Sequence, residues 1–393
     1  MQSRRLFIAS LGAAGFAATI GRAAAQTQDA VKIGMSIPLT GPFSENGKQM
    51  MAAAKLFVEQ NGATVAGRKV ELIFRDDAGV PDQAKRIAQE FVVNDKVAIL
   101  AGYNPTPLAL AVAPIATEAK VPQVVMGAST SIITDRSPYI VRTFSTQPQI
   151  TVPMAQWAAK NGIKRVVTVV SDYAPGLETE KAFVGEFKSL GGEIVESIRM
   201  PLASLDYAPF LQRARDAKPE AMFVWVPGGL AASFLRQYAE RGLATSGIRV
   251  IGTGDITDDD ALNNMGDSTL GLVTALQYSA AHPSDKNKAF VAGFKRLAGG
   301  TRPDHVGVSA YDGLQLIYLA LAKTGGQTDG DALIAAMKGM SWESPRGPIT
   351  IDPETRDIVQ DVYIRRVERV DGELYNIEFD KYPAVKDPTK VKK

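Results

Sequence analysis

The run Ala221-Met-Phe-Val-Trp-Val226 is apolar at every position and is followed at once by the turn Pro227-Gly228-Gly229. A strand that is hydrophobic on both faces is typical of a parallel sheet covered by helices on both sides. A helical pattern follows at 231–241, and another short apolar strand at 249–252. This strand–helix–strand order predicts a doubly wound α/β architecture.

The same alternation runs along the chain in two series, one before and one after Ile150. The strands expected in the two series are 31–37, 69–74, 97–101 and 123–126, then 165–170, 194–200, 221–226 and 249–252. The amphipathic helices expected between them are 48–60, 81–93 and 107–119, then 152–160, 177–190, 207–217 and 231–241. Two such series predict two lobes, each built on a doubly wound parallel sheet.

The C-terminal part of the chain departs from this alternation. Three helical patterns follow in near succession, and three strands come after them: 287–297, 309–323 and 331–340, then 348–351, 359–367 and 373–379. We expect this segment to complete the two lobes rather than to form a third domain. The tail from Pro383 is polar and basic, and we expect it to be frayed.

The composition excludes several classes of protein. The 393 residues include 44 basic and 42 acidic side chains, a formal net charge of +2, whereas nucleic-acid binders usually show a strong basic excess. There is no cysteine, which rules out cysteine nucleophiles, zinc fingers and iron–sulfur clusters. The two histidines, His282 and His305, are expected to lie at the surface or at element boundaries without a catalytic role.

Motifs for phosphate, metal or cofactor binding fail on inspection. The stretch 41–49 has five residues between its glycines and Gln49 after the lysine, whereas a P-loop needs four residues and a hydroxyl. The acidic runs Asp76-Asp77 and Asp258-Asp259-Asp260 have no EF-hand spacing, and we expect them to be solvated helix starts. We therefore expect neither a metal nor a cofactor.

The first twenty-five residues have the features of an export signal. Arg4 and Arg5 precede a mostly apolar stretch at 6–20, and Ala23-Ala24-Ala25 offers a cleavage site before Gln26. The run Ser3-Arg-Arg-Leu-Phe-Ile8 is similar to a twin-arginine motif, and an ordinary secretory signal is the alternative. The mature chain would carry 41 basic and 42 acidic residues, which suits a periplasmic protein.

Six loops lie where ligands bind in open parallel sheets, at the carboxyl ends of the strands. They are rich in Gly, Ser, Thr, Asn and Tyr, and they are 39–47, 102–107, 127–130, 171–176, 227–229 and 252–255. Hydroxyl groups and the amides of helix N-termini suit a carboxylate or a similar anion. Each loop alone fits a turn with a helix cap equally well, but all six together favour a ligand cleft.

Several stretches of this chain resemble the branched-chain amino-acid (Leu/Ile/Val) binding proteins of ABC importers. They occur in the family's order over the whole mature chain: 39–49, 75–78, 109–115 with Pro122, 127–129, 172–176 and 347–352. The resemblance implies a type I periplasmic binding fold whose two lobes close on a ligand by hinge bending. It places three crossings near 143–149, 276–281 and 342–346, with lobe 1 formed by 26–146 plus 278–342 and lobe 2 by 147–277 plus 343–393.

The resemblance also implies a set of binding residues. The family's carboxylate contacts fall on Thr106, Gly127 and Ser129, the tyrosine that covers the ligand on Tyr173, and the acid that pairs with an α-ammonium on Asp255. The alternatives are a helix cap for Asp255 and core packing for Tyr173.

Two positions depart from the family pattern. A first-lobe aromatic is replaced by Asn46, and a second-lobe tyrosine falls near Pro227-Gly228. Tyr103 and Asn104 are further candidate contacts, and Trp225 can face either the core or the cleft.

The resulting hypothesis is a periplasmic solute-binding component of an ABC import system, most simply a monomer. It would capture a small carboxylate, with an amino acid favoured, an aromatic acid next and an amide last, and deliver it to permease subunits at the inner membrane. A sensor subunit of the same fold is the alternative. An exported enzyme would have to rest on carboxylates such as Asp255 and Asp172, because the chain has no cysteine and only two histidines, and we expect no catalysis.

Overall fold

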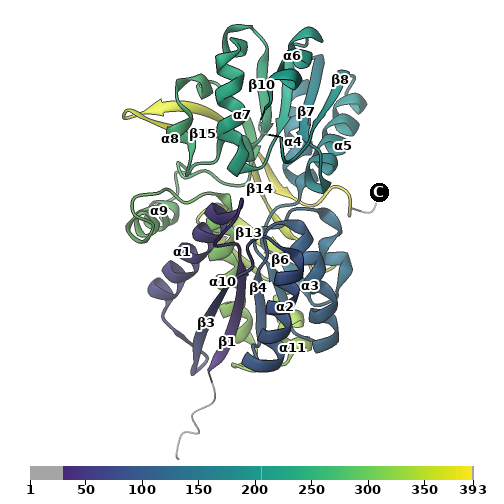
Figure 1. Cartoon of the computed structure of the whole chain (residues 1–393). Helices are drawn as coiled ribbons and strands as arrows, with labels where there is room; N and C mark the ends of the chain where they lie inside the picture. The colour runs from purple at the N-terminus through teal and green to yellow at the C-terminus, as the bar shows by residue number, and fades with distance from the viewer. Residues whose placement is uncertain (1–29, 205, 392–393) are drawn as a thin grey trace, which may run out of the picture.

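The computed structural model describes residues 30–204 and 206–391, which fold into two lobes stacked end to end (Figure 1). The predicted signal peptide, residues 1–25, lies outside the described residues. Within the described ranges, no helix is both long and apolar enough to cross a membrane.

The first lobe is built on a six-stranded sheet in the order β2-β3-β1-β4-β5-β6. All its pairings are parallel except that between β2 and β3. Its strands are β1 (Val31–Ile37), β2 (Thr64–Val65), β3 (Arg68–Asp76), β4 (Ile99–Gly102), β5 (Gln123–Val125) and β6 (Ile140–Arg142). The helical segments between them are α1 (Ser44–Asn61), α2 (Pro81–Glu90), η1 (Phe91–Asp95), α3 (Thr106–Ala119) and η2 (Ser131–Arg136).

The second lobe contains a nine-stranded sheet whose parallel part runs β11-β10-β9-β7-β8. These strands are β7 (Arg165–Ser171), β8 (Glu193–Met200), β9 (Ala221–Trp225), β10 (Arg249–Thr253) and β11 (Val273–Leu276). The longer helices of this lobe are α4 (Gln147–Lys160), α5 (Ala174–Ser189), α6 (Ala208–Asp216) and α7 (Gly228–Glu240). Short helical turns complete it: η3 (Leu243–Thr245), η4 (Gly254–Thr257), α8 (Leu262–Met265) and η5 (Asp267–Thr269).

The C-terminal segment is shared between the lobes. Its helices, α9 (Asp285–Leu297), α10 (His305–Lys323) and α11 (Gly330–Met337), supply side chains to the hydrophobic core of the first lobe. Its strands, β12 (Ser341–Ser344), β13 (Gly347–Ile351), β14 (Ile358–Val370) and β15 (Glu373–Val385), join the second sheet through antiparallel pairing of β14 with β11. The two-lobed α/β prediction is confirmed, whereas the exact lobe boundaries stay a prediction.

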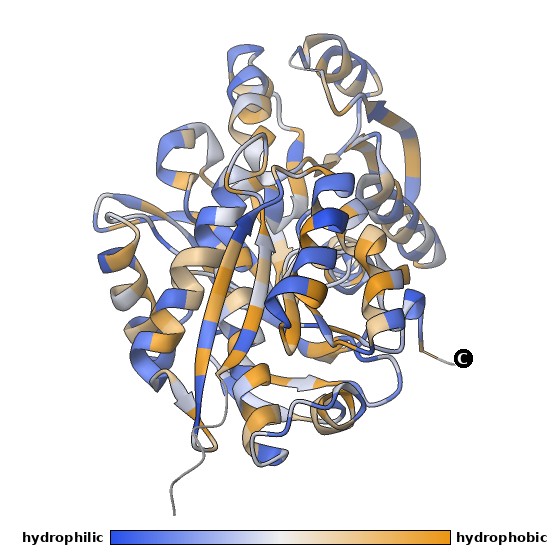
Figure 2. Ribbon diagram, turned by 60° about the horizontal axis from the view of Figure 1, so that its bottom comes forward, coloured by the Kyte–Doolittle hydropathy of each residue, from blue (hydrophilic) through white to orange (hydrophobic). Residues whose placement is uncertain are grey.

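Strand β9 shows why the second sheet needs helices on both faces. Met222 and Val224 pack into one hydrophobic cluster, and Phe223 and Trp225 pack into another on the opposite face. Successive side chains of a strand point to opposite faces, so a strand that is apolar throughout contributes to both cores. Along the helices, in contrast, hydrophilic and hydrophobic residues alternate (Figure 2).

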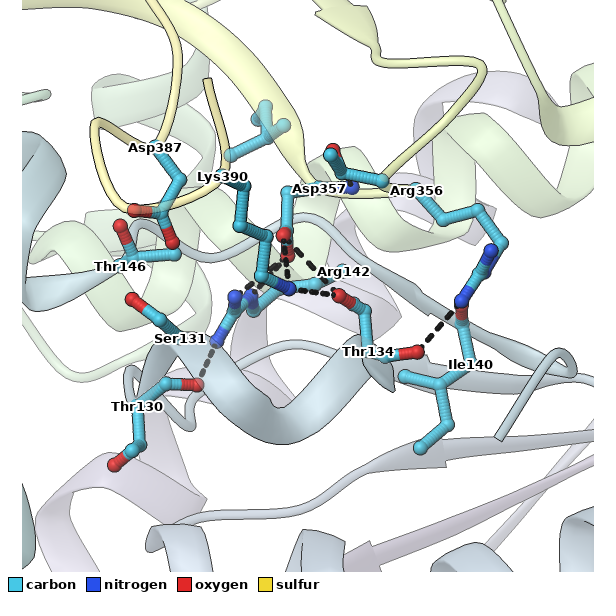
Figure 3. A network of polar contacts seen from close by, with 12 residues as sticks. Thr130, Ser131, Thr134, Ile140, Arg142, Thr146, Arg356, Asp357, Asp387 and Lys390 are labelled. Carbon is cyan, nitrogen blue, oxygen red and sulfur yellow. Dashed lines mark hydrogen bonds and ion pairs between the residues drawn. The ribbon is translucent and has the colours of Figure 1, made fainter. Parts of the chain in front are cut away.

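The C-terminal tail is not frayed as predicted. Strand β15 continues to Val385, and Lys390 beyond it reaches a buried network beside the junction of the lobes (Figure 3). The Lys390 ammonium lies 3.0 Å from Asp357 Oδ2 and donates to Thr134 Oγ1 at 2.6 Å. Asp357 in turn pairs with Arg142 at 2.5 Å. The polar composition of the tail therefore reflects ion pairing rather than solvation.

Candidate functional site: the cleft between the lobes

A cavity lies between the lobes, where about 460 Å³, including space open to solvent, is not filled by protein atoms. Nine of the ten residues predicted to bind ligand line it: Asn46, Asn104, Thr106, Gly127, Ser129, Tyr173, Pro227, Gly228 and Asp255. They come from the carboxyl ends of strands in both sheets, as ligand sites in open α/β sheets do.

Tyr103 is the one predicted contact that does not line the cavity. It follows directly on β4 with a φ of +68°, and its ring is fully buried in the core of the first lobe. The left-handed turn directs the side chain into this core and leaves Asn104 and Thr106 facing the cleft.

Thr106, Ser129 and the N-terminus of α3 form what we call the anion site. Ser129 Oγ accepts a hydrogen bond from Gln147 Nε2 at 3.0 Å, so its own proton is free to be donated to a ligand. Thr106 Oγ1 lies 3.0 Å from Thr130 Oγ1 and is the first residue of the fourteen-residue helix α3. Two hydroxyl donors beside a helix N-terminus can hold a carboxylate without a cationic side chain.

Arg142 holds the loop that presents Ser129. Its guanidinium donates to the carbonyl of Thr130 at 2.7 Å and to that of Ala128 at 3.3 Å, while Asp357 balances its charge (Figure 3). Because Arg142 is fully buried, the loop cannot shift without breaking these hydrogen bonds. The ion-pair network at the junction thereby supports the anion site.

Gly127 lies where no side chain fits. A Cβ atom there would approach Met50 Cε to 2.3 Å and Asn104 Cβ to 2.8 Å. Its carbonyl accepts a hydrogen bond of 2.5 Å from Asn104 Nδ2, and Asn104 Oδ1 accepts from Asn46 Nδ2 at 3.2 Å. Asn46 and Asn104 thus join the first-lobe loops that border the cavity.

Aromatic side chains form much of the cavity wall. The rings of Tyr173 and Trp225 lie 5.5 Å apart, centroid to centroid, and Phe43 and Phe144 line the cavity as well. The sequence left two alternatives for Trp225, a place in the core or a place in the cleft. Its side chain does both, since it belongs to a core cluster and also lines the cavity. Burial, followed by the negative charge of Asp255, raises the pKa of Tyr173, so its phenol stays neutral. Such a wall suits a flat apolar ligand.

Asp255, Asp258 and His305 line the cavity together and form what we call the acid–histidine cluster. His305 Nδ1 lies 2.9 Å from Asp258 Oδ1, and His305 Nε2 lies 3.9 Å from Asp255 Oδ1. His305 lies at an element boundary, as predicted, since it begins α10, but it is buried against the cavity and not at the surface. Asp255 is not a helix cap, since its side chain accepts instead from Thr253 Oγ1 at 2.7 Å.

The cluster carries a protonated imidazole. Burial alone would lower the pKa of His305, but the carboxylates of Asp258, Asp255 and Asp304 outweigh burial and raise this pKa to about 10. Ligand atoms of Asp258, Asp304 and His305 lie within 4.8 Å of one another, a spacing that a metal ion could bridge. Binding of a metal there would require the imidazole to lose its proton. Asp304 also caps α10 by accepting from the amides of Val306 and Gly307.

The two acidic runs are not the solvated helix starts that were predicted. Asp77 is fully buried and accepts from Ser36 Oγ at 2.8 Å, while Asp76 binds the amide of Leu39. Asp258 is buried against His305, and Asp259 is buried 3.7 Å from the Arg365 guanidinium. Tertiary partners from distant parts of the chain explain why these acids are buried.

The lobes also touch beside the cavity. The amide of Ser131 in the first lobe donates to Glu178 on α5 of the second lobe, at 3.1 and 3.2 Å from its two carboxylate oxygens. A Cβ atom on Gly229 would lie only 3.2 Å from the carbonyl oxygen of Pro42, across the cleft. The structure therefore shows the two lobes in contact around the cavity.

Several residues of the cavity were missed from the sequence: Phe43, Pro105, Phe144, Gln147, Pro175, Asp258, His305 and Val306. Phe43 and Pro175 lie within two of the six loops that were expected to form the ligand cleft, so the sequence indicated their location but not their role. Gln147 and Phe144 lie in the first predicted crossing between the lobes. His305 and Asp258 carried no local signal, because only the packing of α10 brings them together.

Comparisons with known proteins agree with this geometry. The family model described as "Periplasmic binding protein" matches residues 30–373. The solute-binding protein of an ABC transporter from Rhodopseudomonas palustris BisB5, in complex with 3,4-dihydroxybenzoic acid, is 60% identical, with a TM-score of 0.91 over 93% of this chain and 100% of that one. Another R. palustris solute-binding protein, in complex with 4-hydroxybenzoate, is 42% identical, with a TM-score of 0.89 over the same shares. Leu/Ile/Val-binding protein homolog 6 of Brucella melitensis is 41% identical over 93% of this chain and 95% of its own length.

Proposed function

The chain belongs to the periplasmic binding protein family, as an ABC transporter solute-binding protein, and we propose that its cleft captures an aromatic carboxylate. The family is one of solute-binding proteins and not of enzymes. The single observation that carries the proposal is the cavity itself, in which the anion site lies within a wall of aromatic side chains.

An aromatic acid suits this cavity better than the amino acid that the sequence favoured. The two R. palustris solute-binding proteins described above were solved with benzoic acid derivatives bound. The rings of Tyr173, Trp225 and Phe144 offer faces and edges for a planar ligand, which an aliphatic side chain would not exploit. Asp255, expected to pair with an α-ammonium, already lies near the protonated His305.

The proposed role places the mature chain in the periplasm, as a monomer that delivers its ligand to the permease subunits of an ABC importer. Closure of the lobes would bury the ligand and bring together the surface that the permease recognises. The export signal predicted at 1–25 is consistent with this location.

The proposal is tested by calorimetric titration of residues 26–393 with benzoate and with L-leucine. We expect benzoate to bind and leucine to bind far more weakly. Thr106→Ala and Ser129→Ala should each weaken benzoate binding by about 1–3 kcal/mol, because each removes a hydrogen bond to a charged group.

Thr117→Ala is the matched control. Thr117 lies on the same helix as Thr106, but its hydroxyl binds the carbonyl of Ala113 and Ser137 Oγ, away from the cavity. This variant should bind benzoate as the wild type does. Tight binding of leucine with no binding of benzoate would contradict the proposal, and unchanged benzoate affinity in the Thr106→Ala, Ser129→Ala double variant would overturn the anion site.

A further inference from the structure

We propose that the acid–histidine cluster, together with the indole of Trp225, binds a hydroxyl group on the ring of the captured acid. The inference rests on the proposed function and narrows its ligand class to aromatic acids that carry a phenolic hydroxyl. It assigns a specificity role to Asp258, His305 and Trp225, and it gives Asp255 a different partner from an ammonium.

The cluster lies where the two lobes meet, because His305 begins α10, which packs into the first lobe, whereas its two acids belong to the second lobe. Thr106 and Ser129 follow β4 and β5 of the first sheet, whereas Asp255 and Asp258 follow β10 of the second. All four side chains line the same cavity. An acid whose carboxylate is held at the anion site can therefore extend its ring across the cavity toward Asp255 and Asp258 of the second lobe.

Polar atoms on Asp255 and on Trp225 have no hydrogen-bond partner from another side chain at this end of the cavity within the described part of the chain. Asp255 Oδ1 lies 3.9 Å from His305 Nε2, too far for a hydrogen bond. The indole nitrogen of Trp225 is buried with no acceptor among the described residues. Asp258 Oδ1 and His305 Nδ1, in contrast, lie 2.9 Å apart and form an ion pair with each other. Buried polar groups are nearly always satisfied, so the unpartnered atoms of Asp255 and Trp225 point to a ligand group between them.

The unpartnered atoms include both acceptors and donors. Asp255 Oδ1 can only accept, whereas the indole N–H of Trp225 and the Nε2–H of the His305 imidazolium can only donate. A phenolic hydroxyl donates one proton and accepts at its oxygen, so it can satisfy one atom of each kind. An ammonium offers donors only and would leave the indole nitrogen unpaired.

Charge argues against the reverse orientation, in which the ligand carboxylate lies on His305. The imidazolium already faces two carboxylates of the cluster, at 2.9 and 3.9 Å. A third carboxylate at this place would be repelled by both acids inside a poorly solvated cavity. The neutral hydroxyl meets no such repulsion.

The test is the ratio of the affinities for 4-hydroxybenzoate and benzoate, measured by calorimetric titration of residues 26–393. We expect the wild type to bind 4-hydroxybenzoate at least about tenfold more tightly, since a hydrogen bond to a charged group accounts for a factor of that order. Asp255→Asn should reduce the ratio to about threefold or less. Trp225→Phe keeps a ring in the wall, removes the N–H donor and should lower the ratio in the same way.

His282→Gln is the matched control. This other histidine also pairs with an acid, Glu378 at 2.8 Å, but it does not line the cavity, and its variant should keep the wild-type ratio. Equal affinities of the wild type for the two acids would overturn the inference and leave the proposed function standing. An unchanged affinity ratio in both Asp255→Asn and Trp225→Phe would do the same. Failure of both acids to bind the wild type would instead overturn the proposed function.

Discussion

Asp77 shows how burial changes the chemistry of a single side chain. It is fully buried and accepts hydrogen bonds from Ser36 Oγ at 2.8 Å and from the amide of Gly79 at 3.0 Å. Burial, helped by repulsion from Asp76, outweighs these bonds and raises the pKa of Asp77 from 3.8 to about 6. The native state therefore holds this proton more tightly than the unfolded chain, and stability falls as the pH rises from about 4 to about 6.

Asp77→Asn is expected to remove this pH-dependent loss of stability. At pH 7 the variant should be more stable than the wild type by on the order of 1–3 kcal/mol, and at pH 4 the difference should disappear. Urea unfolding at the two pH values measures this. Asp76→Asn gives the contrasting case: despite some desolvation, hydrogen bonds from Thr40, Ala78 and Leu39 lower the pKa of Asp76, so its variant should lose stability at pH 7. A pH-independent difference for Asp77→Asn would contradict the assignment.

Single residues of the site were predictable where they sit in loops at strand ends. The loops that hold Thr106, Ser129 and Asp255 were predictable because a strand with an apolar pattern precedes each polar loop, and the resemblance to the binding-protein family then singled out these three residues. His305 was missed because it follows a loop and not a strand, and only the tertiary contact with Asp258 gives it a role. A local pattern cannot show a charge pair between residues so far apart in the chain.

At the level of elements, the long periodic helices and the apolar strands were predicted within a few residues of their bounds. The short strands β6, β11 and β12 were missed, as was the two-residue β2. Each is too short for a clear alternation, and pairing with its neighbours decides its conformation. The strands predicted at 348–351, 359–367 and 373–379 form as β13, β14 and β15, with turns between them.

The tail after β15 yields a prediction of its own. Lys390→Ala removes a largely buried ammonium from the carboxylates of Asp357 and Asp135, each 3.0 Å away. We expect a loss of about 1–3 kcal/mol in unfolding free energy, because Asp357 stays buried with one cation fewer. The matched variant Lys386→Ala breaks a 2.9 Å pair with Asp352 in which the lysine is 57% exposed, and it should cost no more than about 0.5 kcal/mol. Equal unfolding midpoints for the two variants in urea would show that the tail does not stabilise the junction.

For the whole molecule, the contact between the lobes is expected to set how long a ligand stays bound. Glu178→Ala removes the acceptor of the Ser131 amide across the cleft. The variant should weaken all ligands by the same factor, about two- to tenfold, mainly through faster dissociation, because the hydrogen bonds form only when the lobes meet. Stopped-flow measurement of dissociation rates checks this.

Glu186→Ala is the control for that experiment. Glu186 lies on the same helix but accepts from Gln156 at 2.8 Å within the second lobe. Its dissociation rates should match those of the wild type. A Glu178→Ala effect confined to one ligand would place the residue in ligand recognition instead of closure.

The central claim is that the carboxylate of an aromatic acid is held by the first lobe while its ring extends toward the second. A crystal structure of residues 26–393 with 4-hydroxybenzoate tests it most directly. The account predicts carboxylate oxygens about 3 Å from the hydroxyls of Thr106 and Ser129, and the ring hydroxyl beside Asp255, His305 and the indole nitrogen of Trp225. A carboxylate bound to His305, with the ring hydroxyl at Ser129, would contradict it.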